Sequence, residues 1–295
     1  MTLDFSGILK RAFHLTKNNR SLWVFGILMA FLNSGGNIGG RFNYSPDMDS
    51  SKFALPKIDP QTLLLVIVIA VVLGLLLFLI AIFINFLARG ALIDMVDTID
   101  KGGSASIKDG FKSGLSYLFS LFAISFLLGV SFFFAILITG GILIGPGVLL
   151  LLAKKTVFGI ILLALGGLIW LAFLIAGSVF IGVITFFAER EMVLEGLGAI
   201  DSIKAGYALL RKNIGNSLVL WLINFGIGIV SGILVLIIVL ITGLPIYLLA
   251  MALSKWLFIL LIIPFAIIVF VSGLFETFFS TFWTLAFKEL VKSET

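Results

Sequence analysis

The most constraining feature of this chain is the length of its uncharged apolar runs. Residues Leu63 to Ala88 contain no charged side chain, and about 20 such residues cross the ~30 Å hydrocarbon core of a bilayer as a helix. Of the 295 residues, 61% are hydrophobic and 12% are charged, with a mean hydropathy of +1.24. A soluble domain could not cover its core with so little polar surface. The sequence therefore predicts an all-α polytopic membrane protein.

The spacing of the charged residues predicts six transmembrane helices within a single membrane domain over residues 1–295. The expected spans are residues 21–37, 62–88, 115–140, 157–188, 216–242 and 256–287. The longest segment on the far side of the membrane, about residues 38–61, contains Pro46, Pro56 and Pro60. Since proline-rich stretches favour turns, we expect an external surface loop there.

Lys and Arg are unevenly divided between the two sides that six spans define. Fourteen fall on the side that holds both termini, and six fall on the other side: Arg41, Lys52, Lys57, Lys154, Lys155 and Lys255. Because Lys and Arg are retained on the cytoplasmic side, this bias predicts cytoplasmic N and C termini. The net charge of +5 is thus a topology signal, and no nucleic-acid partner is expected.

Three similar short segments recur along the chain, separated by 98 and 96 residues. They share the pattern [Leu/Ile]-Lys-x-[Ala/Gly]-[Phe/Tyr] and begin at Leu9, Ile107 and Ile203. Each precedes a pair of spans, so we expect three repeats of an amphipathic helix plus a helical hairpin. The repeats cover about residues 1–100, 101–198 and 199–295. Because each repeat begins and ends on the same side, a pseudo-threefold arrangement about the membrane normal is the simplest one.

The segment that opens each repeat has an apolar face and a basic face. In the first repeat Phe5, Ile8 and Ala12 recur at helical spacing, and the third repeat has a similar stripe of Val193, Leu197, Ile200, Ile203, Tyr207 and Ile214. Such helices are typical of the lipid surface. The residues expected at this lipid interface are Lys10, Arg11, Lys108, Lys204 and Arg211. The alternative is that these segments are elbows that pack on the bundle.

The second and third repeats each contain an uncharged stretch, of 41 and 42 residues, that is too long for one span and too short for two. Thr139 and Pro146 mark a late break in the first stretch, and Thr242 and Pro245 mark one in the second. We expect each break to end its span near the outer surface, with the following residues packed shallowly in the outer leaflet. The alternative is a re-entrant segment, which protein or water would have to shield.

Glycines that stand four residues apart allow helices to approach closely. From position 110 onward such pairs are Gly110 with Gly114, Gly141 with Gly145, and Gly228 with Gly232. Such pairs are common in membrane sequences, so they predict close packing without naming the partner helix.

Glu276 is the acidic residue that lies deep inside an apolar stretch, twelve residues before Lys288. That spacing places it about 18 Å along the helix from the cytoplasmic end, where inserting an acid costs ~2.5–3.5 kcal/mol. Asn224, at a comparable depth, and Ser272 and Ser280, one turn away on either side, are the expected partners. These four residues form a candidate intramembrane polar site; the alternative is a contact that holds helices together.

The residues that enzymes and metal sites need are missing from this sequence. It contains no cysteine and a single histidine, His14, so a thiolate nucleophile, a histidine-rich metal site and an intramembrane serine–histidine pair are all excluded. Phosphate-loop and dinucleotide-binding fingerprints are absent as well. We therefore expect no enzymatic activity and no cofactor or metal.

Two stretches carry a resemblance to a known group of proteins. One runs from Glu195 to Ser202, continues to Arg211-Lys212-Asn213 and leads into a glycine-rich span; the other is the basic N-terminal helix that leads into Asn19-Arg20-Ser21-Leu22-Trp23. In these the chain resembles uncharacterised prokaryotic integral membrane proteins that are similar to the membrane domain of glycerophosphoryl diester phosphodiesterases. In those enzymes a separate soluble domain carries catalysis. The resemblance therefore implies a six-helix module in a prokaryotic plasma membrane without chemistry of its own.

Two classes of function follow from these observations. The first is a non-catalytic membrane module that organises lipids or partner proteins, favoured by the interfacial helices. The second is a small-solute or ion transporter or channel that uses Glu276 in a polar path. Convergence of Glu276, Asn224, Thr139 and Thr242 on one hydrated cavity would favour transport, and scattered positions would favour the module.

Overall fold

The computed structural model describes residues 3–38, 59–253 and 255–293, and every regular element among them is helical. The elements follow in chain order: α1 (Phe5–Asn18), α2 (Arg20–Ile38), α3 (Pro60–Asp100), α4 (Ile107–Leu152), α5 (Thr156–Glu195), α6 (Ala199–Lys212), α7 (Ile214–Ile238), the π-helical η1 (Val239–Gly243), α8 (Leu244–Ala252), the 3₁₀-helical η2 (Lys255–Leu261) and α9 (Ile262–Lys292). The expected external loop at about residues 38–61 falls largely outside the described residues.

Local sequence explains where several of these helices begin and end. The Asp4 carboxylate accepts a hydrogen bond from the Gly7 backbone N–H at 2.9 Å and caps α1, while Ser106 and Asp109 form a capping box at the start of α4. Both devices satisfy N–H groups that have no partner within the helix. At the other end of a helix, Gly196 has a φ of 71° and terminates α5, a left-handed conformation that glycine adopts without a steric penalty.

Five helical segments are long and apolar enough to cross a membrane: Gln61–Asp100, Ile107–Leu152, Thr156–Glu195, Ile214–Ala252 and Trp256–Lys292. The chain is accordingly a membrane-embedded helical protein. The first of the six expected spans falls on α2, whose apolar part, Arg20–Leu32, is shorter. Helix α2 itself continues through Gly35 and Gly36 to Ile38, 19 residues in all.

The expected ends of two spans were wrong. Helix α4 runs without a break through Thr139 and Pro146 to Leu152, and the chain reverses only at Ala153–Lys155, where Lys154 has a φ of 58°. The third repeat differs, since α7 passes through the π-helical turn η1 into α8 with no reversal at Pro245. A proline is tolerated inside a membrane helix when local adjustments re-satisfy the freed backbone groups. Neither segment is therefore set apart from its long helix by a break at the proline.

The segments that open the three repeats also differ from one another. Helices α1 and α6 are separate, each of 14 residues, and each ends before an asparagine, Asn19 or Asn213, whose side chain donates to the carbonyl four residues earlier. The second segment is no separate helix, because α4 continues from Ile107 into the apolar run. The stripe expected from Val193 to Ile214 was likewise wrong as one helix, since it spans the end of α5, a linker, α6 and the start of α7.

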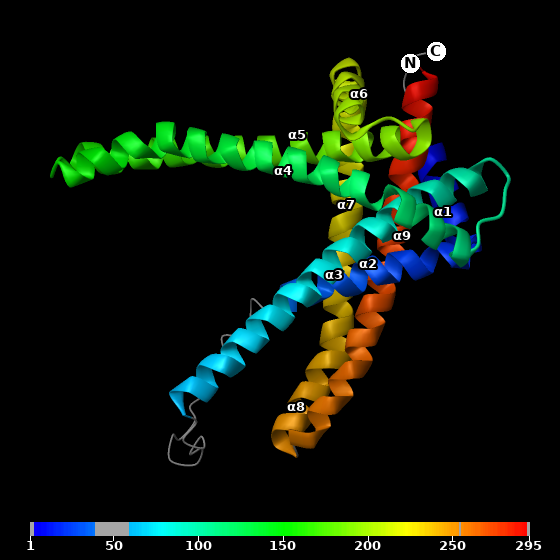
Figure 1. Cartoon of the computed structure of the whole chain (residues 1–295), viewed down its shortest axis with the longest axis horizontal. Coiled ribbons are helices and arrows are strands. Elements are labelled where there is room, and N and C mark those ends of the chain that lie inside the picture. The colour runs from blue at the N-terminus through cyan, green and yellow to red at the C-terminus, as the bar shows by residue number, and fades with distance from the viewer. Residues whose placement is uncertain (1–2, 39–58, 254, 294–295) are drawn as a thin grey trace.

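The long helices spread from a common centre as arms, which Figure 1 shows. Helices α4 and α5 form one arm, α7, α8 and α9 form a second, and α3 extends as a third. The outer part of α3 is exposed along its length, from Leu63 at 48% to Phe78 at 62%. Apolar side chains that face no protein are suited to contact lipid.

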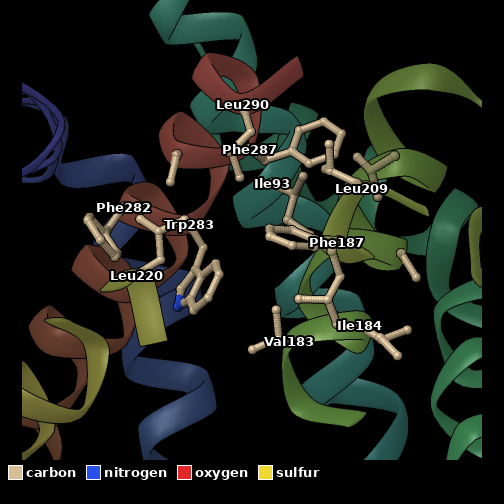
Figure 2. Packing of buried hydrophobic residues seen from close by; sticks show 14 of the residues in the cluster. Ile93, Val183, Ile184, Phe187, Leu209, Leu220, Phe282, Trp283, Phe287 and Leu290 are labelled. Atoms are coloured by element: carbon tan, nitrogen blue, oxygen red, sulfur yellow. The ribbon is translucent and has the colours of Figure 1, made fainter. Parts of the chain in front are cut away.

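The arms meet in a packed apolar centre, which we call the hub (Figure 2). It includes Phe187 of α5 and Trp283 and Phe287 of α9, each no more than 1% exposed. Phe186 stacks on Trp283 with ring centroids 4.6 Å apart. Ala12 of α1 and Leu209 of α6 are buried in the same cluster, so both short helices pack on the hub. The hub is thus the part of the molecule where helices α1, α3, α4, α5, α6, α7 and α9 meet.

Glycines let the backbones of α2 and α9, and those of α3 and α4, pack closely against each other. A Cβ atom at Gly26 of α2 would collide with Thr277 and the Gly273 carbonyl of α9, and one at Gly114 of α4 would collide with the Leu87 carbonyl of α3. Of the three glycine pairs from position 110 onward, only Gly110 with Gly114 is used in this way. Gly141, Gly145, Gly228 and Gly232 have nothing within 4 Å of such a Cβ, so those glycines contribute no close contact between the described helices.

Candidate functional site

A cavity of about 260 Å³ lies at the hub, and we call it the junction cavity. Its lining comes from five helices: Met29 of α2, Arg89 and Ile93 of α3, Phe186, Glu189 and Arg190 of α5, Asn224 of α7, and Glu276, Phe279 and Ser280 of α9. Four of these side chains are ionisable. Charged groups rarely gather at such a place in a membrane protein, because burying each of them is costly.

An ion-pair network joins α3, α5 and α9 at the cavity. Arg89 Nη1 lies 3.0 Å from Glu189 Oε1, and Arg190 Nη1 lies 3.8 Å from Glu189 Oε2. Arg190 also donates to the Phe186 carbonyl at 2.9 Å and to the Ser280 carbonyl at 3.3 Å. One carboxylate of α5 therefore faces two guanidinium groups, and Arg190 reaches across to α9.

Burial makes this network energetically demanding. Arg190 and Glu189 are each 2% exposed, whereas the Arg89 side chain is 35% exposed. Removing buried ions from water costs several kcal/mol per ion, which only good geometry and further hydrogen bonds offset. The network is consistent with that requirement, because the Arg190 guanidinium has two carbonyl acceptors as well as the carboxylate.

The polar residues of α7 and α9 occupy the arm side of the hub. Along α9, Glu276 and Ser280 come before the core residues Trp283 and Phe287 when the helix is followed from the arm to the hub. Asn224 Oδ1 accepts a hydrogen bond from Trp283 Nε1 at 2.9 Å. The cavity therefore lies where the arms begin to diverge, just before the apolar core closes.

A second charged group joins the first and third repeats outside the cavity. Lys288 of α9 donates to Asp97 at 2.8 Å and to Asp100 at 2.6 Å, both on α3. Arg11 of α1 pairs with Asp100 and, at 3.8 Å, with Glu289. We call these residues the terminal clasp, because they join α1 to the C-terminal ends of α3 and α9.

Comparison with known proteins gives a family for this arrangement. The model of a family of unknown function, DUF7544, matches residues 11–290. The chain belongs to this family. No curated protein and no solved structure gave a significant match. The DUF7544 description carries no activity, so the likeness to phosphodiesterase membrane domains stays a prediction.

Three of the four polar residues expected in this DUF7544 chain line the junction cavity, namely Glu276, Asn224 and Ser280. Ser272, the fourth, is not among the lining residues. The Asn224 oxygen accepts from Trp283, and the pairing of Asn224 with Glu276 stays a prediction.

The two threonines named as tests of a continuous polar path lie elsewhere. Thr139 donates to the Ala135 carbonyl at 2.7 Å, and Thr242 donates to the Ile238 carbonyl at 2.6 Å. Each hydroxyl thus bonds to its own helix, and neither lines the cavity. Glu276 and Asn224 line the same cavity, and both threonines lie outside it. The four residues whose meeting in one cavity would favour transport therefore converge only in part.

The basic residues expected at the lipid interface all lie on the hub side of the molecule. Lys10, Lys108, Lys204 and Arg211 are exposed, and Lys204 pairs with Asp201 at 3.3 Å. Arg11 differs, because it takes part in the terminal clasp. Exposed large apolar residues accompany them: Phe13, Ile107, Phe111, Ile200, Tyr207 and Ile214.

Sequence reasoning missed the three charged residues at the centre of the cavity. Arg89, Glu189 and Arg190 stand at the ends of apolar runs, where we counted the arginines only as cytoplasmic topology signals. The sequence holds one signal, since in Ala88-Arg89 and in Ala188-Glu189 a charged residue directly follows a long uncharged run. In the described part of the chain no cluster of three or more His, Cys, Asp or Glu could hold a metal ion.

Proposed function

We propose that this chain is a non-catalytic integral membrane module that organises lipids or partner proteins. It crosses a prokaryotic plasma membrane with six spans, α2 included, as three pseudo-threefold repeats with cytoplasmic termini. The observation that carries the proposal is the divergence of the arms from the hub (Figure 1). Arms that separate leave their apolar faces to lipid or to other membrane proteins.

The exposure of the arms supports this proposal. In the most apolar 18-residue windows of Gln61–Asp100 and of Ile214–Ala252, none of the residues is buried. A transport path needs helices that pack around it and line it with polar groups. Helices that leave such windows uncovered are better suited to hold a patch of lipid or to receive a partner's helices.

The hub side of the molecule supports a lipid-facing role as well. Exposed Phe13 of α1 and exposed Ile200 and Tyr207 of α6 lie close in sequence to basic residues such as Lys10 and Lys204. Apolar and cationic side chains together favour the interface between headgroups and acyl chains. Cationic residues at that height would also favour the anionic lipids of a cytoplasmic leaflet.

Distances between arm tips test the proposal in a bilayer. The chain has no cysteine, so spin labels can be placed on Leu152→Cys and Leu253→Cys, at the tips of two arms, in lipid nanodiscs. We expect a long and broad distance distribution between these labels. The control pair, Leu149→Cys with Val157→Cys within one hairpin, should give a short and narrow one. A short, narrow distribution between the arms would show that they pack together, and the proposal would fail.

The orientation can be tested on the same cysteine-free background. Lys212→Cys and Ser293→Cys should react with a membrane-impermeant thiol reagent only from the cytoplasmic side, because we place both ends of the third repeat there. Lys154→Cys, at the turn between α4 and α5, should react only from outside. Labelling of Lys154→Cys and Lys212→Cys from the same side would contradict the proposed topology.

A second function has one specific observation in its favour. Glu276, Asn224 and Ser280 share a cavity with Arg89 and Arg190, so a solute or ion transporter could use this charged site. The test is uptake of candidate solutes and ions by vesicles that contain the purified chain. Transport that Glu276→Gln abolishes and Asp201→Asn leaves unchanged would favour this function over the module.

A further inference from the structure

The inference concerns the occupant of the junction cavity, and it rests on the proposed function. The cavity lies at the point where the three arms diverge, and Met29, Ile93, Phe186 and Phe279 form the apolar part of its lining. In the proposed topology, the hub lies at the cytoplasmic face and the space between the arms holds inner-leaflet lipid. The headgroup of a lipid in that space would stand at the height of the hub.

The charges of the cavity are arranged as two poles. Arg89 and Arg190 share the single carboxylate of Glu189, so this group of three carries a surplus positive charge. Glu276 supplies a negative charge from α9, one helical turn before Ser280. Because Arg190 donates to the carbonyl of Ser280, which lies about one helical turn (~5.4 Å of rise) beyond Glu276 on α9, the positive and negative poles meet α9 at different heights.

We propose that the junction cavity binds the headgroup of a zwitterionic phospholipid, one that carries both a phosphate and an ammonium group. The guanidinium groups of Arg89 and Arg190 receive the phosphate, since paired N–H donors match its oxygens. The Glu276 carboxylate receives the ammonium group, because a carboxylate has about four lone-pair sites and can accept from more than one donor. The acyl chains then extend between the arms.

The choice of a zwitterion follows from the charge count of the lining. Two arginines and two glutamates leave the cavity without net charge, so an anionic headgroup would meet the repulsion of Glu276 and a cation would meet that of the arginines. A ligand with both charges satisfies both poles. The chain holds the cavity with helices from all three repeats, so a bound headgroup would also link the arms.

Native mass spectrometry of the full chain tests this assignment. The protein, delipidated in detergent, is incubated with an equimolar mixture of a phosphatidylethanolamine and a phosphatidylglycerol of the same acyl chains. We expect one phosphatidylethanolamine to be retained per chain, at least five-fold more often than phosphatidylglycerol. Glu276→Gln should reverse this preference, since it removes the site for ammonium and the repulsion of anions together.

Further variants separate binding from folding. Arg89→Gln should lower the retention of both lipids, Glu276→Asp should restore the original preference in part, and Asp201→Asn, on the exposed face of α6, should change nothing. Each variant is first checked for an unchanged helical content and elution volume. A lipid ratio that Glu276→Gln leaves unaltered overturns the proposal, and so does loss of retention to the same degree in all variants.

A soluble competitor distinguishes the lipid from a free small molecule. Phosphoethanolamine carries the same charges without acyl chains, and we expect it not to displace the lipid at concentrations where phosphatidylethanolamine is retained. Tight binding of phosphoethanolamine to the lipid-free chain would overturn the lipid as the occupant. The distances between arm tips are measured on chains with an intact cavity, so a failure of the module proposal and a failure of this inference give separate results.

Discussion

Arg190 has the most constrained surroundings of the charged residues in the hub. It is 2% exposed, and its neighbours are the Glu189 carboxylate and two backbone carbonyls from different arms. The guanidinium also lies over the Phe186 ring, 5.6 Å from its centroid. A planar cation with several donors can satisfy all of these groups at once, and neither lysine nor an apolar side chain can. The residue therefore links α5 to α9 through its hydrogen bond to the Ser280 carbonyl, while its contacts with Glu189 and Phe186 stay within α5.

Arg190→Met should destabilise the chain by about 3 kcal/mol, because it removes the charge-assisted hydrogen bond to the Ser280 carbonyl and one of the two guanidinium groups that face Glu189. The measurement is thermal unfolding in a fixed detergent. Glu189→Gln in the same chain should lower the stability further, since Arg89, which lies 3.0 Å from Glu189, then loses its carboxylate. Lys204→Met, in an exposed pair, should cost no more than about 0.5 kcal/mol. If Arg190→Met and Lys204→Met lowered the stability equally, burial would not explain the cost of removing Arg190.

At the scale of the helices, close backbone contact decides which elements pair. Helix α2 lies against α9 rather than along the outer part of α3, because Gly26 and Gly273 let the two backbones meet. This contact brings the first repeat against the third, although their residues are far apart in the sequence. The hydroxyl of Thr277 lies at the same crossing and donates to the Gly273 carbonyl at 2.9 Å.

Gly26→Ala or Gly273→Ala should separate α2 from α9 and destabilise the chain by about 1–3 kcal/mol, the usual cost of overpacking. The added methyl group would collide with the opposite helix, whose backbone cannot move aside cheaply. Gly228→Ala is the matched control, since nothing lies within 4 Å of its Cβ position and alanine favours the helix. Thermal unfolding compares the three. An equal loss of stability in Gly228→Ala would show that helix propensity, not the crossing, governs the result.

At the scale of the whole molecule, ion pairs and charged hydrogen bonds join the helices near the hub, where the apolar arms begin to separate. The charged residues of the junction cavity join α5 to α3 and to α9, and the terminal clasp joins α9 to α3. Lys288 has 18% of its side chain exposed and contacts two carboxylates of α3. Such charge-assisted hydrogen bonds are the stronger kind, so the clasp helps to fix the direction in which α3 leaves the hub.

Lys288→Met should lower the stability of the chain by about 2 kcal/mol, because a hydrogen bond to a charged group contributes roughly 1.5–3 kcal/mol. It should also broaden the distance distribution between Leu64→Cys on the α3 arm and Leu253→Cys on the α9 arm. Lys292→Met, with 65% of its side chain exposed, should leave both quantities nearly unchanged. A narrow distribution in Lys288→Met would show that the apolar hub alone fixes the arms.

The sequence alone predicted the helical class, the membrane environment and three of the residues that line the cavity. Apolar run length determines the first two, because hydrocarbon forces a backbone to satisfy its own hydrogen bonds. Glu276 was recognisable for the related reason that an acid inside such a run needs a partner. The ends of the helices were not predictable in this way, since Pro146 and Pro245 can either terminate a helix or be accommodated within it.

Only the tertiary structure decided which charges meet and how the arms lie. Arg89 and Glu189 are 100 residues apart, and Lys288 is 191 residues from Asp97, so no local pattern could pair them. The count of Lys and Arg on each side of the membrane treated Lys204 and Arg190 alike, although Lys204 is exposed and Arg190 is buried. The hydropathy of a segment depends on its composition alone, and it determines whether lipid or water surrounds that segment. The partners of a side chain depend on the helix crossings, and these are set by contacts such as that of Gly26 with Gly273.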